Sequence, residues 1–178
     1  MPIAARLTKR GYQLQAFENQ LARPIGDAPG PASSLLVTAA TPGQDELWLR
    51  IAATGFAVPD SATVAAAAAP SELVENIKRV MAGFIHPEFE RLLVWVDGEP
   101  AGAANVFVID GVLGIAGTTT LPAFRRRGVQ QAVVSHALNR GLGRASLAMA
   151  TTEPGSISQR NFERCGFQVM YTRAIFVL

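Results

Sequence analysis

The sequence predicts an α/β fold in which a mixed, mostly antiparallel central sheet is flanked by helices. Two Asp-Gly pairs, at 97–98 and 110–111, join three segments of period-two alternation, which is typical of an antiparallel meander. Before and after this meander, apolar residues recur at helical spacing in segments bounded by glycine or proline. The length of 178 residues favours a single domain with a sizeable core.

The chain before the meander contains two predicted strands and two predicted helices. The strands cover 12–25 and 34–41, and a Gly- and Pro-rich loop over 26–31 lies between them. One helix begins at Asp45 and stops at Gly55. The other begins near Pro70, is capped by Ser71 and ends at Gly83.

The remaining elements follow from the meander onward. We predict strands over 91–96, 101–109 and 112–121, a helix over 129–141, a strand over 145–150, a helix over 156–164 and a final strand over 167–178.

The predicted elements after residue 33 already make a complete set. We therefore assign residues 34–178 to the main domain and residues 1–33 to an N-terminal strand and loop. We hypothesise that residues 1–33 are the remnant of a second, tandem domain that precedes this one in a longer native chain.

Composition limits the classes of protein to consider. The longest uninterrupted apolar run, residues 64–69, is far shorter than the ~20 residues of a membrane span, so we predict no membrane partner. The first ten residues lack the apolar core of a secretory signal. Cys165 is the only cysteine, which excludes an internal disulfide and is typical of a cytoplasmic protein.

Charge is divided unevenly along the chain. Residues 1–110 carry a net charge of −4 and residues 111–178 a net charge of +6, with Glu153 and Glu163 the only acids in the second part. A cationic half indicates an anionic partner there, either phosphate or nucleic acid. We predict no nucleic-acid partner, because this half lacks the lysines and interleaved aromatics typical of such an interface.

The segment 118–131, TTTLPAFRRRGVQQ, has the pattern of an anion site. A strand ends at Pro122, an arginine-rich turn follows, and a helix starts after Gly128. The first N–H groups of such a helix have no intrahelical partner, and its dipole places partial positive charge there. The lysine of a Walker loop and the glycine triplet of a dinucleotide fingerprint are absent.

This segment resembles the acyl-CoA signature of the GNAT superfamily of N-acetyltransferases. The match runs over Leu121-Pro122-x-x-Arg125-x-x-Gly128-x-Gln130, and SQRNFERCGF over 158–167 resembles the next helix of that family. The order of the predicted elements from residue 35 onward also agrees, which is about four-fifths of the chain.

The resemblance implies that acetyl-CoA is the acyl donor. Its pyrophosphate would lie on the amides of residues 126–131, and its pantetheine arm would pair like a strand with residues 119–121. A splayed strand pair would admit the arm, with a bulge at Gly114 or Gly117. The residues predicted to bind the cofactor are Thr119, Thr120, Leu121, Arg125, Arg126, Arg127, Gly128, Val129, Gln130, Gln131, Ser158 and Asn161.

Three departures from the family pattern concern the cofactor and the chemistry. Gln130 replaces the usual glycine or alanine, Phe162 replaces the usual tyrosine general acid, and no carboxylate occurs over 112–121 where many members have a glutamate base. Catalytic residues therefore stay unassigned. The candidates are a water held by Thr118, Thr119 or Thr120, a carboxylate from Glu88 or Glu90, and Tyr171 as a substitute acid.

Other reactive side chains have simpler interpretations. His136 falls at the spacing of a packed helix histidine, and His86 precedes a proline in a loop. Cys165, Trp48 and Trp95 are predicted core residues. No metal-binding motif is predicted.

The sequence thus predicts transfer of an acetyl group from acetyl-CoA to a primary amine of a small molecule or peptide. The alternative is a weakly active or inactive GNAT-fold module that binds CoA. The amine substrate is unidentified, and a homodimer is left open.

Overall fold

The computed structural model describes residues 1–26, 30, 32–58, 69–83 and 86–178. Its strands are β1 (Gln13–Pro24), β2 (Leu36–Ala39), β3 (Glu90–Val96), β4 (Glu99–Ile109), β5 (Val112–Thr120), β6 (Leu147–Thr152) and β7 (Gln168–Val177). Its α-helices are α1 (Ile3–Lys9), α2 (Asp45–Ala57), α3 (Ser71–Ala82), α4 (Val129–Gly141) and α5 (Ile157–Arg164). Short 3-10 turns cover Pro42–Gln44 and Pro122–Phe124.

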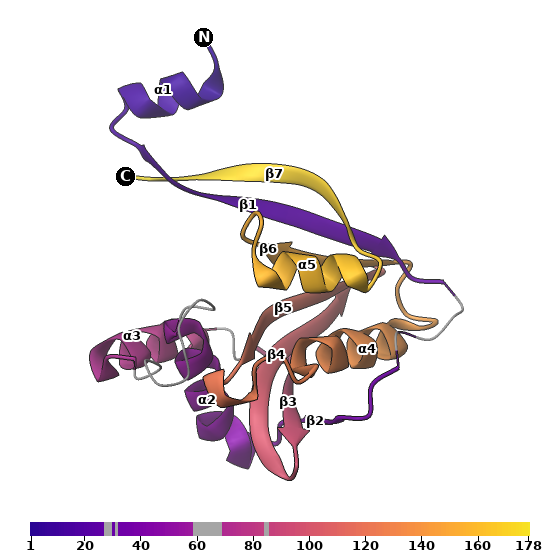
Figure 1. The fold of residues 1–178 in the computed structure, drawn as a ribbon. Helices are drawn as coiled ribbons and strands as arrows, with labels where there is room; N and C mark the ends of the chain where they lie inside the picture. Colours follow the sequence, from indigo (N-terminus) through magenta and orange to yellow (C-terminus); the bar gives the residue numbers. More distant parts are fainter. Residues whose placement is uncertain (27–29, 31, 59–68, 84–85) are drawn as a thin grey trace.

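The strands form one sheet in the order β2-β3-β4-β5-β6-β1-β7 (Figure 1). Only β5 and β6 pair in parallel, and the other neighbours are antiparallel. The predicted mixed, mostly antiparallel α/β fold is therefore confirmed. Both Asp-Gly turns are also confirmed, because Asp97, Gly98, Asp110 and Gly111 all have the positive φ angles of primed hairpin turns.

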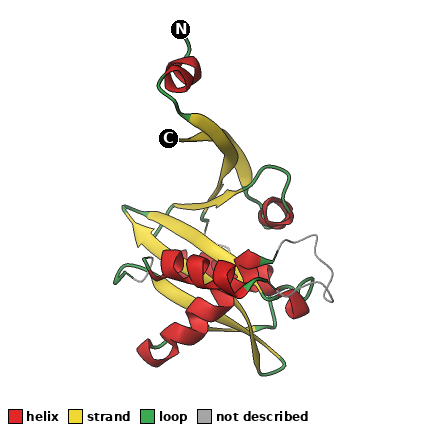
Figure 2. Ribbon diagram, turned by 90° about the vertical axis from the view of Figure 1, so that its left-hand side faces the viewer, coloured by secondary structure: helices red, strands yellow, loops and turns green. Residues whose placement is uncertain are grey.

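Helices cover both faces of the sheet (Figures 1 and 2). The alternation along β3 divides the core: Leu92 and Val94 pack in a cluster with α4 and α5, whereas Leu93 packs on the opposite face with Trp48 of α2 and Met81 of α3. Apolar residues at period two in the strands and at helical spacing in the helices thus build a three-layer arrangement.

Several local predictions need correction. Ser71 is the first residue of α3 and does not cap it, because Pro70 occupies the cap position and no side-chain cap bond forms. β6 extends two residues beyond the predicted end, since it pairs with β1 up to Thr152. α1 was not predicted from the sequence, and none of its residues is buried.

The N-terminal strand belongs to the same sheet as the rest. β1 lies between β6 and β7, and the β1–β7 ribbon extends beyond the helix-covered part toward α1 (Figure 1). The division at residue 33 stays a prediction. The Gly/Pro loop over 26–31 and the alanine-rich run over 64–69 lie mostly outside the described residues. Within the described residues, no helix has the length and apolar character needed to span a bilayer.

Candidate functional site

β5 and β6 separate halfway along β5. Their parallel pairing runs from Val112↔Leu147 to Ile115↔Ala150 and stops there, although β5 continues to Thr120. β6 instead pairs with β1 up to its last residue. We call the opening between residues 116–120 of β5 and residues 151–152 of β6 the splay. The predicted splayed strand pair is confirmed.

A β-bulge on β5 lies at the splay. Ala103 pairs with Thr119 but Asn105 pairs with Ala116, so Gly117 and the next residue stand opposite one residue of β4. Gly117 has a φ of +59°, a conformation that favours glycine. The prediction of a bulge at Gly117 is confirmed.

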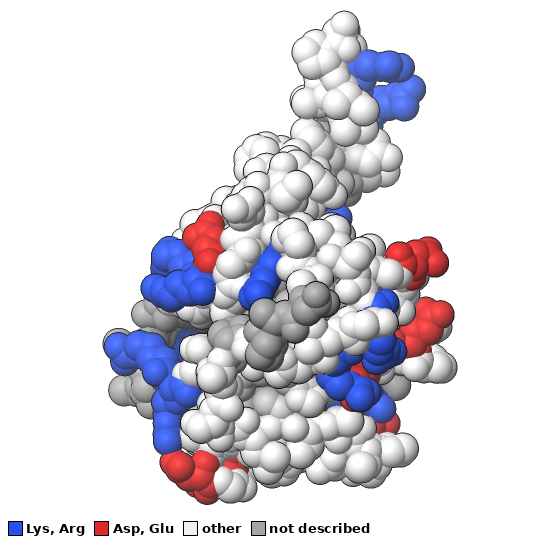
Figure 3. Space-filling view, turned by 90° about the vertical axis from the view of Figure 1, so that its right-hand side faces the viewer, with Lys and Arg blue, Asp and Glu red and all other residues white. Residues whose placement is uncertain are grey.

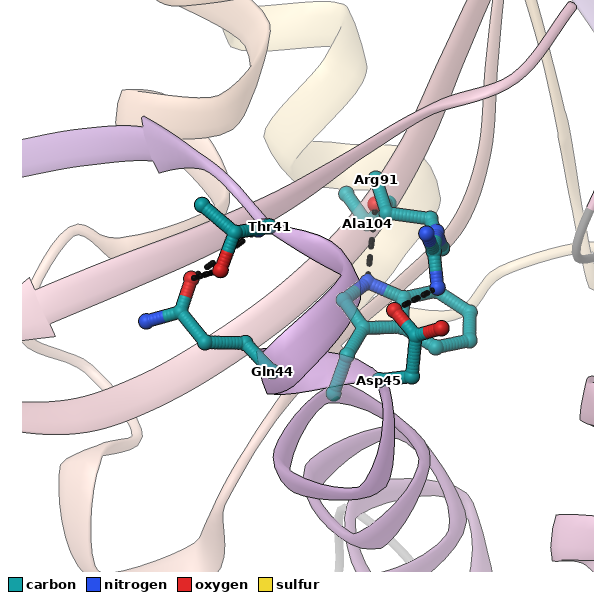
Figure 4. A network of polar contacts seen from close by, with 6 residues as sticks. Thr41, Gln44, Asp45, Arg91 and Ala104 are labelled. Atoms are coloured by element: carbon teal, nitrogen blue, oxygen red, sulfur yellow. Dashed lines mark hydrogen bonds and ion pairs between the residues drawn. The ribbon is translucent and has the colours of Figure 1, made fainter. Parts of the chain in front are cut away.

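The same bulge is anchored from helix α2. The side-chain Nε1–H of Trp48 donates to the carbonyl of Ala104, the β4 residue opposite the bulge, at 3.2 Å. Figure 4 shows Ala104 beside the ion pair between Asp45 at the start of α2 and Arg91 of β3. The alternative bulge position, Gly114, is wrong: it pairs regularly on both sides, and a Cβ there would lie 2.0 Å from the Phe107 ring.

The end of β5 presents its backbone to the splay. The Leu121 N–H donates to the Ala101 carbonyl on the β4 side at 2.9 Å. Because backbone groups alternate in direction along a strand, the N–H and C=O of Thr120 face the opposite edge, from which β6 has departed. Thr119 is buried under α2, where a Cβ at Gly55 would lie 2.0 Å from its Oγ1.

Helix α4 begins at the end of this strand. Gly128 is its N-cap with a left-handed φ of 81°, and no side chain caps it. The first intrahelical bond runs from the Ala132 N–H to the Gly128 carbonyl at 2.9 Å, which leaves the N–H groups of residues 129–131 without helical partners. No acidic residue lies in the first turn. These groups form a typical anion-binding helix terminus.

The three arginines of the turn have different surroundings. Arg125 donates to the carbonyls of Val58 at 2.5 Å and Gly55 at 3.4 Å, which ties the turn to the end of α2. Arg127 pairs with Asp97 at 2.6 Å. Arg126 is exposed, has a φ of 63° and forms no ion pair with the residues that the structure describes. The motif match singles out Arg125, but nothing in the sequence predicts the different contacts of these three residues.

Gln130 joins α4 to α5. Its Nε2 donates to the Ser158 hydroxyl at 2.8 Å, and its Oε1 accepts from the Asn161 side chain at 2.8 Å. Three predicted cofactor residues, one from α4 and two from α5, therefore meet. The Gln131 side chain instead turns away and donates to the Ala32 carbonyl at 3.3 Å.

A family model described as Acetyltransferase (GNAT) family matches residues 60–167. The chain belongs to the GNAT acetyltransferase family. No curated protein matches it in sequence.

Solved structures show the same fold. A GCN5-related N-acetyltransferase from Kribbella flavida superposes with a TM-score of 0.67 at 23% identity, over 98% of this chain and 62% of that one. The ribosomal-protein-S18-alanine N-acetyltransferase from Escherichia coli gives 0.56 at 13% identity, over 74% and 76%. AAC(6')-Iy, in complex with the bisubstrate analogue CoA-S-monomethyl-acetylneamine, gives 0.52 at 20% identity, over 82% and 98%.

The shared length varies among these GNAT structures. This chain spans 62% of the length of the Kribbella flavida protein. A functionally unknown conserved protein from Staphylococcus epidermidis also superposes with a TM-score of 0.67, at 12% identity over 95% of this chain, and this chain spans 63% of its length.

The usual GNAT acid position holds no acid here. Phe162 is 2% exposed and packs edge-on against Phe167 with ring centroids 5.1 Å apart. The proposed substitute acid Tyr171 is exposed on β7, and β1 separates this strand from β6.

The two candidate carboxylates also lie elsewhere. Glu90 pairs with Arg140 in the last turn of α4 at 3.1 Å, the opposite end of the helix from Gly128. A helix of 13 residues is about 20 Å long, so Glu90 is remote from the anion-binding terminus. Glu88 is exposed beside His86, with Nδ1 and Oε2 3.8 Å apart. Glu90 is thus held by Arg140, and a base at the splay stays unassigned.

The simpler interpretations of the remaining side chains agree with the structure. Trp48 and Cys165 are buried, and burial raises the pKa of the Cys165 thiol. Trp95 is partly buried and donates to the Thr38 hydroxyl at 2.9 Å. His136 is half-buried on α4, and burial lowers its pKa.

Polar side chains around the splay were largely missed by sequence reasoning. Among the described residues, buried side-chain atoms without a hydrogen-bond partner are Gln20 Nε2, Asn105 Oδ1, Thr118 Oγ1, Thr152 Oγ1 and His136 Nε2. All but the last lie on the strands that border the splay or on their direct neighbours. The signal in the sequence that could have found these side chains was a polar residue within a predicted apolar strand, as at Asn105.

Basic side chains do not form one continuous stripe on the face in Figure 3. They occur as separate groups, several of them next to acidic side chains, and one group lies on the projecting N-terminal part.

Proposed function

We propose that this GNAT protein transfers an acetyl group from acetyl-CoA to a primary amine of a small molecule or peptide. The observation that carries the proposal is the splay, which opens beside the uncapped start of α4. The superposition on AAC(6')-Iy, whose bisubstrate analogue contains CoA, supports the same choice of acyl donor.

The residues at the site fit the chemistry of CoA. Pyrophosphate needs converging N–H donors and positive charge, which residues 129–131 and Arg126 supply. The amide-containing pantetheine arm needs an unpaired strand edge, which Thr120 supplies. In this proposal Gln130, Ser158 and Asn161 hold the α5 side of the site in place.

Acyl transfer then proceeds by direct attack in a ternary complex. The neutral amine nitrogen attacks the thioester carbonyl, the carbon–sulfur bond breaks, and the proton lost by nitrogen ends on the thiol of CoA. Backbone N–H groups at the splay stabilise the negative charge that develops on the carbonyl oxygen.

Arg126→Ala tests the donor site. Loss of one charge-assisted contact is expected to weaken CoA binding about tenfold, roughly 1.4 kcal/mol, measured by calorimetry. Arg144→Ala removes the same charge beyond the other end of α4 and serves as the matched control. Acetyl-CoA turnover is measured in parallel as release of free thiol over a panel of amines. Absence of CoA binding by the wild-type protein would overturn the proposal.

The second candidate function is a GNAT module that binds CoA without transferring the acyl group. Buried Phe162 and the absence of a carboxylate from β5 favour it. Calorimetric binding of CoA without thiol release on any amine would support this candidate over the first.

A further inference from the structure

Asn105 is the most deeply buried polar side chain among the described residues. It lies on β4 and is 1% exposed, and its Oδ1 has no hydrogen-bond partner. A buried carbonyl oxygen without a donor is unfavourable, and native proteins rarely keep one without a reason. An apolar residue at this position would avoid that cost. We therefore relate the presence of asparagine here to the reaction at the splay.

The neighbours of Asn105 place it beside the bulge. Its cross-strand partners are Ala116 on β5 and Arg91 on β3. A Cβ added at Gly117 would lie 3.5 Å from Asn105 Nδ2 and 3.4 Å from the Met81 side chain. Because Gly117 has no side chain, the amide of Asn105 borders this part of the bulge, with Nδ2 nearer to Gly117 and Oδ1 on the other side of the same amide.

The charged groups nearest along the strands are already committed to each other. Arg91 of β3, the cross-strand neighbour of Asn105, pairs with Asp45 of α2 (Figure 4). The Asp45 carboxylate is therefore held by a guanidinium and is not available to an incoming amine. Among the described residues, Asn105 Oδ1 is a neutral oxygen acceptor beside the bulge that has no donor.

We propose that Asn105 binds the acceptor through its amino group and selects a weakly basic amine, of the kind of the α-amino group of a peptide. This inference rests on the proposed acetyl transfer. Oδ1 accepts a hydrogen bond from the amine N–H and orients the nitrogen lone pair. Asn105 is a binding residue and takes no proton: the proton of the amine ends on the CoA thiol, as in the reaction above.

A neutral acceptor in a buried site favours amines that are already uncharged. Burial disfavours an ammonium group, and an amide oxygen cannot neutralise it. At pH 7.5 about one quarter of α-amino groups are neutral, against about one in 800 alkylamines of the lysine type. This difference of about 200-fold is only partly offset by the greater nucleophilicity of the alkylamine.

The first arm of the experiment compares two acceptor probes on the wild-type protein. Free thiol released from acetyl-CoA is measured with L-alaninamide and with n-propylamine at pH 7.5. The expected kcat/KM is at least about tenfold higher for L-alaninamide. An equal or higher value for n-propylamine overturns the inference and leaves acetyl transfer intact, whereas no release with any amine overturns both.

The second arm uses Asn105→Leu, which keeps the number of side-chain heavy atoms and the branching at Cγ and removes the oxygen. KM for L-alaninamide is expected to rise at least about tenfold, because the amine loses its hydrogen-bond acceptor, while KM for acetyl-CoA stays within about twofold. The melting temperature is expected to rise by about 2–4 °C, because the unpartnered oxygen is gone. A purely structural role predicts the reverse: a lower melting temperature and an unchanged KM.

Two further variants complete the comparison. Asn105→Asp restores an oxygen acceptor and adds a negative charge, so the preference is expected to move toward n-propylamine by at least about threefold. Asn19→Ala is the matched control, because Asn19 is a buried asparagine whose amide is bonded to Gln159 and Thr172. It is expected to lower the melting temperature without changing the KM for L-alaninamide. If Asn105→Leu behaves like Asn19→Ala, the inference is wrong.

Discussion

The two halves of β5 differ in how they pair with their neighbours. Its first half, residues 112–115, pairs with β4 on one side and β6 on the other, and Leu113 and Ile115 are buried in the main core. Its second half, residues 116–120, pairs only with β4 and carries the bulge. The first half holds the sheet together, whereas the second half leaves backbone and side-chain polar groups for another molecule.

This difference between the two halves of β5 accounts for the positions of two buried side-chain atoms that have no hydrogen-bond partner. A strand paired on both edges satisfies its backbone groups within the sheet, so its residues are selected for packing. A strand that loses one neighbour must satisfy that edge from outside. Thr118 Oγ1 and Asn105 Oδ1 lie along the second half or beside it, and none of the buried unpartnered atoms of the described residues lies on the first half.

Gly55→Ala is expected to have the largest effect on the second half. The new Cβ would lie 2.0 Å from Thr119 Oγ1 and 3.1 Å from Thr119 Cβ, so α2 must move away from β5. Overpacking of this kind costs about 2 kcal/mol, which lowers the melting temperature by roughly 4–8 °C. KM for acetyl-CoA is expected to rise as well, because Thr119 borders the splay. Calorimetric melting and thiol release measure the two effects.

Gly43→Ala is the matched control for this substitution. Gly43 lies in the 3-10 turn before α2, and a Cβ there meets nothing within 4 Å. Its melting temperature is expected to stay within about 2 °C of the wild type, since it adds no close contact. If both variants melt alike, the close approach of α2 to Thr119 does not support the second half of β5.

Gly117→Ala is expected to have an intermediate effect and tests the bulge. Gly117 and Gly111 both have positive φ angles, of 59° and 74°, so alanine at either position costs roughly 1 kcal/mol of backbone strain. The melting temperature should fall by about 2–4 °C in both variants. Only Gly117→Ala should also lower kcat/KM, by about tenfold, because its methyl group enters the space beside Asn105. Equal kcat/KM values would show that the bulge has no part in the reaction.

The sequence predicted the elements well because its signals are local. Asp-Gly turns, alternation and helical spacing placed all seven strands and four of the five α-helices of the described residues, with errors of a few residues at their ends. The helix start at Gly128 and the bulge at Gly117 were also predictable, since glycine marks both positions.

The site itself depended on contacts that the sequence does not encode locally. Arg125, Arg126 and Arg127 are identical side chains in one run, and only the fold sends Arg125 to the end of α2 and Arg127 to Asp97. Glu90 is a candidate base from the sequence alone, and only the fold pairs it with Arg140. Such roles depend on residues distant in the chain, which periodicity and spacing cannot reveal.

Substitution of His136 is expected to have the smallest effect on stability. It tests an unpartnered atom that lies away from the splay, in contrast to those near the splay. Its Nε2 is buried without a partner on α4, away from the splay. Burial lowers its pKa, Glu90 opposes this shift, and Arg140 adds to it. Because the unfolded histidine binds its proton first, stability from this group is present above about pH 6.5 and is lost as the pH falls toward the lowered pKa.

His136→Gln should therefore lose less stability than the wild type between pH 7.5 and pH 5.5, measured as the difference in melting temperature. His86→Gln is the control, because His86 is exposed in a loop, and it should follow the wild type. Asn105→Leu should also keep the wild-type pH dependence of stability, since an amide does not titrate. If His136→Gln instead follows the wild type, the burial of His136 does not contribute to the pH dependence of stability.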